Sequence, residues 1–433
     1  MDQIQGQHSA GKVAFCTLGC RLNISETGSI SQEFVDRGHE VVPFGEEADT
    51  ILINTCTVTD GADSTCRNLI RKAHKSSPEA RIVVVGCYAQ MEPKAIAEMK
   101  GVDLILGNSE KHKVFEYLEE EERQKINIEM TNEFWGAATT PSDGHTRAFL
   151  KIQDGCNYIC SFCIIPFARG RARAIKIADA LLEADRLVES GFKEIVLTGV
   201  NIGEYENAHG ETLSELVSRV FAVEGVERVR LSSVEPNTYS DELLNTLASS
   251  PKFMNHFHIP LQSGDDDILC SMRRKYSVAD YREIVEKVVA LFPDASIGAD
   301  MIVGYPGETE EQFLKTYDLV KELPITHFHV FPYSKRKGTM AARMDDHIHN
   351  SVKKERVKRL FELGEEKLLE FSGKMVGKRY NVLFETCEDG FFEGYTPNYV
   401  KVKVASTAEL KNQTRDVYIT EMKGGQLFGE IVS

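Results

Sequence analysis

Short apolar runs typical of β-strands alternate with amphipathic helical stretches along most of the 433-residue chain. Before residue 125 the apolar runs are "KVAFCTLGC", "TILINTCTV" and "RIVVVGCYA", and a helical stretch follows each of them. Strands that are separated by helices are joined by crossovers, so they pair in parallel. We therefore predict an open parallel α/β sheet for residues 1–125.

The same alternation continues from residue 147 to residue 372. The helical stretch "ADALLEADRLVESG" ends at Gly191, and "SVADYREIVEKVVALF" has Ser277 as its predicted N-cap. The six strand candidates are "AFLKI", "EIVLTG", "RVRLSS", "HFHIPL", "GADMIVG" and "THFHVF". Six such units predict an open (βα)6 barrel, in which the loops that follow the strands carry the active site.

Two breaks divide the chain into three parts. The charge run 117–130 and the turn-rich stretch 136–146 predict a linker at residues 126–146. Residues 373–433 change to short alternating strands, as in "VKVKV", and predict a small β-barrel. Lysine and arginine balance aspartate and glutamate in this last part, so either a basic face or an ordinary solvated surface fits it.

The composition excludes some classes of protein. Residues 1–9 are polar, and we find no apolar run long enough to cross a membrane, so we expect a cytoplasmic protein with no membrane partner. Ten cysteines in such a protein favour metal or redox chemistry over disulfides. The net charge of −15 disfavours general nucleic-acid binding but leaves room for a local basic patch.

Three cysteines stand at the ends of the first three strands. Cys20, Cys56 and Cys87 are about one strand-helix-strand unit apart, and the carboxyl ends of parallel strands share one edge of the sheet. A single cysteine is more often a small buried apolar residue, but three at strand ends favour a shared site. Cys16 falls inside a strand and is expected in the core, and we assign no role to Cys66.

A second group of cysteines is packed into "GCNYICSFCIIP", which follows the first strand of the predicted barrel. Cys156, Cys160 and Cys163 have the spacing C-x3-C-x2-C. Structural zinc takes four protein ligands, and no fourth cysteine or histidine follows at regular spacing. A [4Fe-4S] cluster uses one thiolate per iron, so three thiolates leave one iron open for another ligand. We favour the cluster over zinc or a purely structural role.

This loop resembles the signature of the radical S-adenosylmethionine (SAM) enzymes. The chain as a whole resembles the radical SAM methylthiotransferase family, through motifs that occur in order along nearly its whole length. These motifs are "TLGCRLN", "NTCTVT", "VVGCYAQ", "IQDGCNYICSFCIIPFARGRAR", "LTGVNIG", "LSSVEP", "HIPLQSGDD" and "GADMIVGYPGET".

The resemblance implies two [4Fe-4S] clusters and SAM. One cluster would bind Cys156, Cys160 and Cys163, and the other would bind Cys20, Cys56 and Cys87, the strand-end group. In this family the open iron of the first cluster binds SAM, and that of the second holds the sulfur to be transferred. The C-terminal barrel resembles the family's TRAM domain, which implies RNA binding.

"NTCTVT" and "IIPFARGRAR" are most similar to the branch that acts on N6-threonylcarbamoyladenosine beside the tRNA anticodon. The implied reaction adds a methylthio group to C2 of that base. Other branches act on N6-isopentenyladenosine or on an aspartate of a ribosomal protein. A non-catalytic iron–sulfur RNA-binding protein is the alternative of a different class.

Several further residues lie where the resemblance implies contacts with SAM, although turns or barrel packing account for some of them equally well. They are Tyr158, Phe162, Gly199, Ser233, Glu235, Gln262, Asp300 and Gly304. Histidines 256 and 258 alternate on one strand and are expected to line the barrel.

Three arginines follow the second cysteine group at intervals of two residues. Arg169, Arg171 and Arg173 are expected to hold tRNA phosphates or the carboxylate of the threonylcarbamoyl group. The expected partners are tRNA, an electron donor and a sulfur source.

Overall fold

The computed structural model describes residues 11–119, 125–141, 144–206 and 210–432. The chain forms two compact units, of which the first comprises residues 1–143 and 164–171 and the second comprises residues 144–163 and 172–433. The polar start of the chain (1–9), part of the charge run (120–124) and two residues of the predicted linker (142–143) lie outside the described residues.

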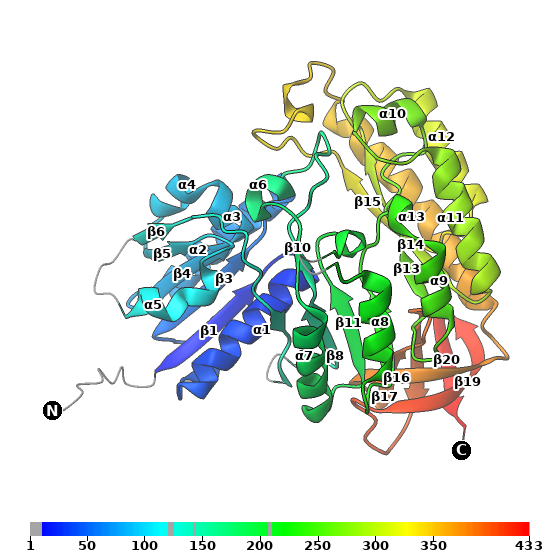
Figure 1. The fold of residues 1–433 in the computed structure, drawn as a ribbon, viewed down its shortest axis with the longest axis horizontal. Helices are drawn as coiled ribbons and strands as arrows, with labels where there is room; N and C mark the ends of the chain where they lie inside the picture. The colour runs from blue at the N-terminus through cyan, green and yellow to red at the C-terminus, as the bar shows by residue number, and fades with distance from the viewer. Residues whose placement is uncertain (1–10, 120–124, 142–143, 207–209, 433) are drawn as a thin grey trace. The chain divides into compact units, whose positions relative to one another are not determined.

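A six-stranded parallel sheet with the order β2-β1-β3-β4-β5-β6 forms the centre of the first unit, which confirms the predicted open α/β fold (Figure 1). Its strands are β1 (Lys12–Thr17), β2 (Glu40–Val42), β3 (Thr50–Thr55), β4 (Arg81–Gly86), β5 (Val102–Leu106) and β6 (Lys125–Asn127). Both β6 and the short β7 (Ala137–Ala138) form within the segments that the sequence marked as a charge run and a linker.

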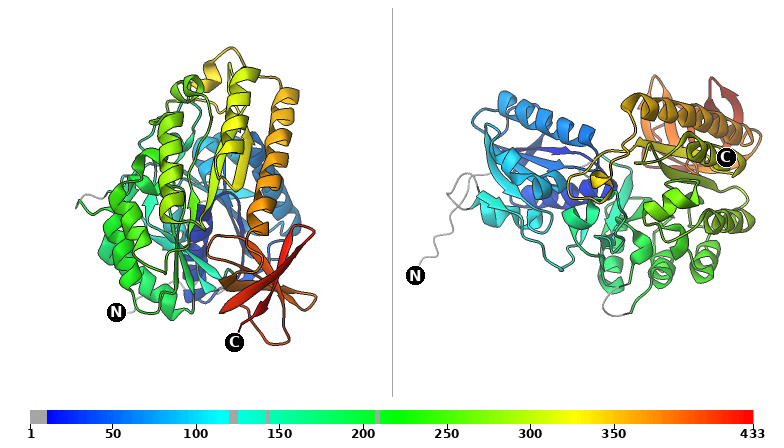
Figure 2. Two further views of the ribbon diagram at one scale, coloured as in Figure 1. Left: turned by 90° about the vertical axis from the view of Figure 1, so that its right-hand side faces the viewer. Right: turned by 90° about the horizontal axis from the view of Figure 1, so that it is seen from above.

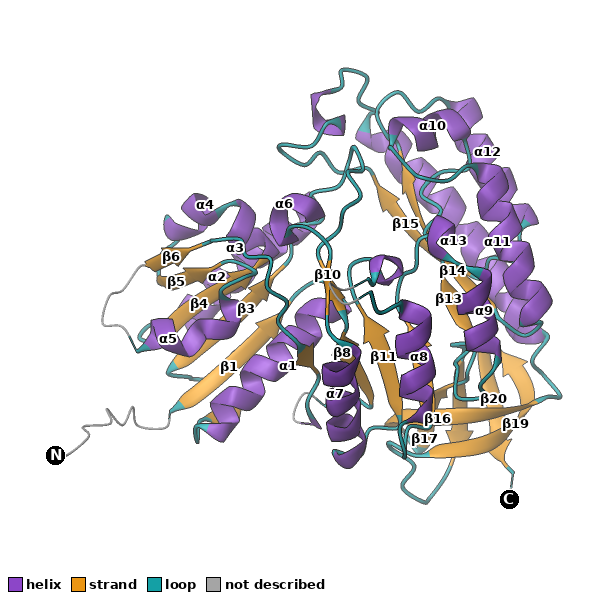
Figure 3. Cartoon of the chain, in the orientation of Figure 1, coloured by secondary structure: helices purple, strands orange, loops and turns teal. Residues whose placement is uncertain are grey.

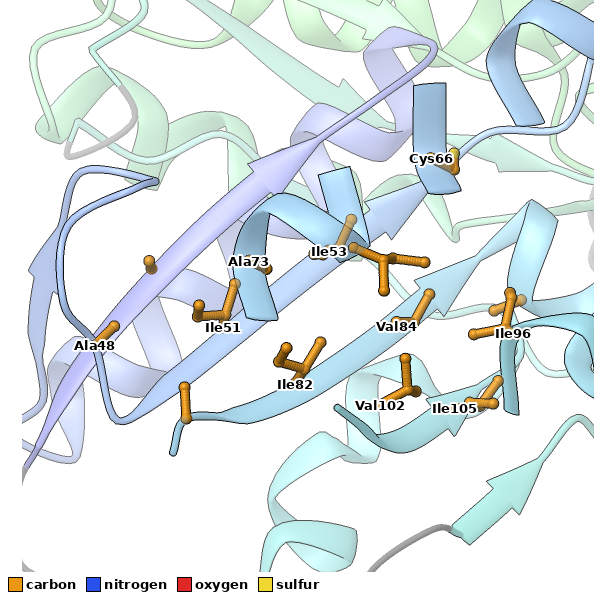
Figure 4. Close-up of a cluster of buried hydrophobic side chains, with 14 of the residues drawn as sticks. Ala48, Ile51, Ile53, Cys66, Ala73, Ile82, Val84, Ile96, Val102 and Ile105 are labelled. Atoms are coloured by element: carbon orange, nitrogen blue, oxygen red, sulfur yellow. The ribbon is translucent and has the colours of Figure 1, made fainter. Parts of the chain in front are cut away.

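Helices pack on both faces of this sheet (Figure 3). The helices of this unit are α1 (Arg21–Asp36), α2 (Asp60–Ser76), α3 (Cys87–Met91), α4 (Pro93–Ala97), α5 (Val114–Leu118) and α6 (Ile165–Arg169), of which α6 packs against α3. Successive residues of a strand point to opposite faces, so Ile51 and Ile53 join the core under α2, as Figure 4 shows, whereas Leu52 joins the core under α1 and α5.

Six parallel strands, each at a predicted position, form the predicted partial barrel of the second unit. They are β8 (Arg147–Lys151), β11 (Glu194–Thr198), β12 (Arg228–Leu231), β13 (His256–His258), β14 (Ser296–Val303) and β15 (His327–Pro332). The first three pair in the order β12-β11-β8 and the last three in the order β13-β14-β15. The short strands β9 (Gln153–Asp154) and β10 (Arg173–Ala174) pair beside them.

Amphipathic helices connect these strands, and the described capping residues explain where several of them begin. The helices are α7 (Ile177–Glu189), α8 (Leu213–Ala222), α9 (Asp241–Ala248), α10 (Asp266–Ser271), α11 (Val278–Leu291), α12 (Glu310–Glu322) and α13 (Asn350–Gly373). Ser277 caps α11 as predicted, because its hydroxyl accepts the backbone N–H of Asp280 and the Asp280 carboxylate accepts that of Ser277.

The C-terminal strands close into a barrel of order β16-β17-β18-β20-β19, which confirms the predicted small β-barrel (Figure 2). They are β16 (Arg379–Glu388), β17 (Phe391–Tyr395), β18 (Lys401–Ala405), β19 (Thr414–Lys423) and β20 (Gln426–Ile431). Buried Arg228 and Arg230 both pair with Glu194 and also donate to backbone carbonyls of this barrel, so the barrel packs on the (βα)6 strands.

Candidate functional site

The three N-terminal cysteines all lie just after the carboxyl ends of strands of the first sheet. Cys20 caps α1 just after β1, Cys56 follows β3, and Cys87 begins α3 directly after β4. Burial, together with the neighbouring thiols of Cys87 and Cys20, raises the pKa of the Cys56 thiol to about 12. Strands β1, β3 and β4 are neighbours in the sheet, so the three cysteines follow adjacent strand ends.

Gly19 allows the close approach of two of these chain segments. Its φ is +99°, and a β-carbon at this position would lie 3.0 Å from the Cys56 sulfur. A larger residue would therefore be strained in its backbone and would collide with the thiol. The glycine of "TLGC" thus lets this segment lie against Cys56.

A buried polar network lies beside Cys87. Glu26 and Lys111 are fully buried and form an ion pair, and Arg169 donates to both carboxylate oxygens of Glu26 at 3.0 Å. Arg169 also donates to Asn23 at 2.6 Å. Asn108 connects this network to Cys87, because its side chain accepts from Lys111 at 2.9 Å and donates to the Cys87 sulfur at 3.5 Å. Arg169 is 2% exposed, so it is part of the interior of the first unit.

The second cysteine group occupies the loop after β8 and β9. Cys160 is buried, whereas Cys156 and Cys163 are half-buried. The N–H of Cys163 donates to the carbonyl of Cys160 within the loop, and the N–H groups of Asn157 and Ser161 hold the loop to Glu204 and to the Met272 carbonyl. Burial and the Glu204 carboxylate raise the pKa of the Cys156 thiol.

Arg274 lies against this loop, although nothing in its stretch "MRRKY" (residues 272–276) distinguishes it from its basic neighbours. Its guanidinium donates to the Cys160 sulfur at 3.1 Å and pairs with the carboxylate of Glu235. Burial raises the pKa of the Glu235 carboxyl, and the cation of Arg274 opposes this shift. Glu235, one of the predicted SAM contacts, is thus part of a buried ion pair beside the cysteine loop.

Ser233 and Asp300, two more of the predicted SAM contacts, are joined through a histidine. The His258 ring bonds Ser233 through Nδ1 at 2.6 Å and Asp300 through Nε2 at 2.9 Å. Burial acts to raise the pKa of Asp300, but His258 and His329 outweigh it and the pKa is lowered. His256 and His258 pack against His327 and His329 of β15, so both line the barrel as predicted.

Gln262 follows β13 with a φ of +65°, and its backbone N–H donates to the carbonyl of Asp300. Left-handed conformations of bulky residues are uncommon and cluster at functional sites. Gly199 packs so tightly that a β-carbon would lie 2.7 Å from the Gln153 side chain. A β-carbon at Gly304 would collide with Lys353. All three residues lie on loops that follow strands of the partial barrel.

The two aromatic residues of the cysteine loop have different surroundings. The hydroxyl of Tyr158 bonds Asn237, and the ammonium of Lys275 lies 3.8 Å from its ring centre. Phe162 packs instead against an apolar cluster that includes Met272 and Tyr305. The structure therefore gives Tyr158 a polar setting and Phe162 a packing role.

The three regularly spaced arginines have three different environments. Arg169 is buried, as described above, and Arg173 donates to the Asp154 carboxylate at 2.9 Å. Arg171 is exposed. Their regular spacing in the sequence therefore does not give them a common role.

All ten cysteines carry free thiols. Across the described residues, no group of three or more histidine, cysteine, aspartate or glutamate side chains is arranged to hold a metal ion. The donor chemistry of the two cysteine groups fits iron–sulfur clusters, which bind cysteine thiolates. Among the same residues, no helix is long and apolar enough to cross a membrane.

The chain matches two family profiles. Residues 150–320 match the Radical SAM superfamily, and residues 12–107 match a family described as uncharacterized protein family UPF0004. A three-dimensional likeness is found to the radical SAM methyltransferase TsrM of Kitasatospora setae, with a TM-score of 0.55, 17% identity and 77% of each chain covered. The cobalamin-dependent radical SAM enzyme OxsB has a TM-score of 0.53 at 12% identity, with 82% of this chain and 56% of that chain covered. These likenesses concern the fold alone.

Curated relatives cover almost the whole chain. The threonylcarbamoyladenosine tRNA methylthiotransferase MtaB of Bacillus subtilis is 41% identical, with 96% of this chain and 95% of that protein covered. MtaB of Aquifex aeolicus is 40% identical, with 90% of this chain and 96% of that protein covered. The tRNA-2-methylthio-N(6)-dimethylallyladenosine synthase of Fusobacterium nucleatum is 33% identical, with 97% of this chain and 100% of that protein covered. The chain therefore belongs to the radical SAM methylthiotransferase family.

Proposed function

We propose that this chain adds a methylthio group to C2 of N6-threonylcarbamoyladenosine beside the anticodon of tRNA. The observation that carries the proposal is that Cys20, Cys56 and Cys87 follow three neighbouring strands of one parallel sheet, in a chain that also matches the Radical SAM superfamily. A radical SAM enzyme that only abstracts hydrogen needs one cluster, whereas a second three-thiol site offers a place for the sulfur. Relatives at 41% and 40% identity that carry this activity in their names support the substrate.

In this proposal the two cysteine groups hold two [4Fe-4S] clusters. Cys156, Cys160 and Cys163 hold the one that binds SAM, and Cys20, Cys56 and Cys87 hold the other. When bound, such a cluster with SAM supplies a carbon radical able to remove hydrogen from an unactivated carbon.

The residues of the chain orient SAM around that chemistry. Glu235 and Arg274, which form a buried ion pair beside Cys160, offer opposite charges to the amino and carboxylate groups of SAM. Asp300, whose pKa is lowered by its histidine neighbours, is an acceptor for SAM hydroxyl or amine groups, and His258 fixes its orientation. Gly199 lies on a loop of the same barrel edge and completes the proposed SAM contacts with Ser233, Tyr158, Phe162, Gln262 and Gly304.

Arg171 is the arginine we propose for the substrate. It is exposed, whereas Arg169 is buried and Arg173 is half-buried. A threonylcarbamoyl group carries a carboxylate, and a guanidinium can bind it through two parallel hydrogen bonds. An isopentenyl group offers no such partner, so Arg171 favours the threonylcarbamoyl substrate.

The remaining parts of the proposal concern the partners. The closed C-terminal barrel is proposed as a TRAM-like domain that binds tRNA, with an electron donor and a sulfur source as further partners in the cytoplasm. The proposed domains are residues 1–125 for the second cluster, 126–146 as a linker, 147–372 for radical SAM chemistry and 373–433 for RNA.

A competition experiment tests the substrate. Reconstituted enzyme receives SAM, a reductant and equal amounts of tRNA with threonylcarbamoyladenosine and tRNA with isopentenyladenosine, and nucleosides are analysed by mass spectrometry. We expect a methylthio product on the threonylcarbamoyl nucleoside and little on the other. Because one relative is named as a dimethylallyladenosine synthase, the isopentenyl-modified tRNA is the alternative substrate. Preference for that tRNA would overturn the proposed substrate but not the radical SAM chemistry.

A further inference from the structure

Asn108 is the polar residue that links the buried network of the first unit to Cys87. It follows β5 and is 5% exposed. One side-chain N–H donates to the carbonyl of Ala168 at 2.8 Å, and the side-chain nitrogen lies 3.5 Å from the Cys87 sulfur. An amide nitrogen has two hydrogens, so one is available for each acceptor.

The orientation of this amide is determined by its other side. The Asn108 oxygen accepts from the Lys111 ammonium at 2.9 Å, and an ammonium can only donate. A flipped amide would turn its NH₂ group toward Lys111 and its oxygen toward the sulfur, so the network excludes that orientation. Lys111 is itself fixed by Glu26, which Arg169 holds in place through two hydrogen bonds.

We propose that Asn108 is a positioning residue for the second cluster: its N–H, aimed at Cys87 by Lys111, raises the reduction potential of a cluster bound there. The inference rests on the proposed second cluster. Hydrogen bonds to cluster sulfurs stabilise the reduced, more negative state, and they are among the recognised determinants of cluster potential. Arg169, although it lies beyond the radical SAM cysteines in sequence, contributes to this orientation through Glu26.

The test measures a potential. The parent is the full-length chain with Cys156, Cys160 and Cys163 changed to alanine, so that any cluster is on the N-terminal group. Asn108→Asp keeps the shape of the side chain and replaces the donor by an acceptor. We expect unchanged iron content and a more negative midpoint potential, with the oxidised-to-reduced ratio shifted about tenfold, equivalent to about 59 mV for a one-electron couple. An anaerobic redox titration followed by electron paramagnetic resonance reports it.

Asn127→Asp is the matched control, because it makes the same change in the same unit at a residue that bonds Tyr117 and no cysteine. It should leave the potential unchanged. If Asn108→Asp loses the cluster, Lys111→Met decides, since it keeps Asn108 but removes the group that orients it, and it should also lower the potential. If both Asn108→Asp and Lys111→Met bind the cluster and leave its midpoint potential unchanged, the inference is overturned. A parent that binds no cluster would instead refute the second cluster, and this inference with it.

Discussion

Changing Arg169 to alanine should destabilise the first unit, whereas the same change at Arg171 should not. The Arg169 side chain is 1% exposed and donates three hydrogen bonds, two to Glu26 and one to Asn23. Breaking a buried ion pair costs about 3–5 kcal/mol, and we take about 3 kcal/mol because Glu26 retains Lys111. An exposed arginine changes stability by about 0.5 kcal/mol or less.

The single tryptophan gives a local assay for this difference. Trp135 packs against the core of the first unit and stacks on His112, so its fluorescence reports unfolding there. A loss of about 3 kcal/mol lowers the melting temperature of a unit of this size by roughly 6–12 °C. Arg169→Lys keeps the charge but not the paired hydrogen bonds, so its melting temperature should lie between those of Arg169→Ala and the parent protein. Equal melting temperatures for Arg169→Ala and Arg171→Ala would refute the assignment of Arg169 to the interior.

Other predictions address the clusters, the pH response and the RNA surface. Changing Cys20, Cys56 and Cys87 together to alanine should halve the iron of the anaerobically reconstituted protein and leave reductive SAM cleavage intact; iron at the parent level would contradict the second site. Cys66→Ala should keep both clusters, since Cys66 is buried and its thiol donates to the Cys56 carbonyl; loss of iron would make it a ligand. Burial and then His329 lower the pKa of His327 from 6.5 to about 4, so stability is fully present above pH 6.5 and is lost as the pH falls toward 4. At pH 5 this loss of stability is about 2 kcal/mol. Calorimetry of His327→Gln should show a melting temperature that falls less steeply with pH than that of the parent protein, and an equally steep fall would contradict this role of His327. Changing the exposed Lys411 and Lys423 of the C-terminal barrel to glutamate should weaken tRNA binding and reduce its salt dependence, and unchanged affinity would argue against RNA contacts at these two residues.

The strands and the strand-end positions of the N-terminal cysteines could be predicted from the sequence for a physical reason. Period-2 and period-3.6 patterns report local burial, and parallel connection then places the strand ends on one edge. Cys20, Cys56 and Cys87 could therefore be grouped without coordinates. The edge strand β6 could not be predicted from the sequence, because "KIN" lies within a charge run and becomes a strand only through its pairing with β5.

Residues whose role depends on a distant partner were beyond this reasoning. "FARGRAR" contains three similar arginines, and only the position of Glu26, 143 residues away, makes Arg169 a buried residue. Arg274 contacts Cys160 across 114 residues, and nothing in "MRRKY" distinguishes it from Arg273. Asn108 follows a strand as many asparagines do, and its contact with Cys87 depends on how β4 and β5 pair.

The central claim is that this chain is a methylthiotransferase for threonylcarbamoyladenosine in tRNA. Its most direct test is mass analysis of tRNA nucleosides from cells with the protein, cells without it, and cells in which Cys56→Ala replaces the native chain. We expect 2-methylthio-N6-threonylcarbamoyladenosine only in the first, with the unmethylthiolated nucleoside accumulating in the other two. Equal amounts of the methylthiolated nucleoside in all three would contradict it.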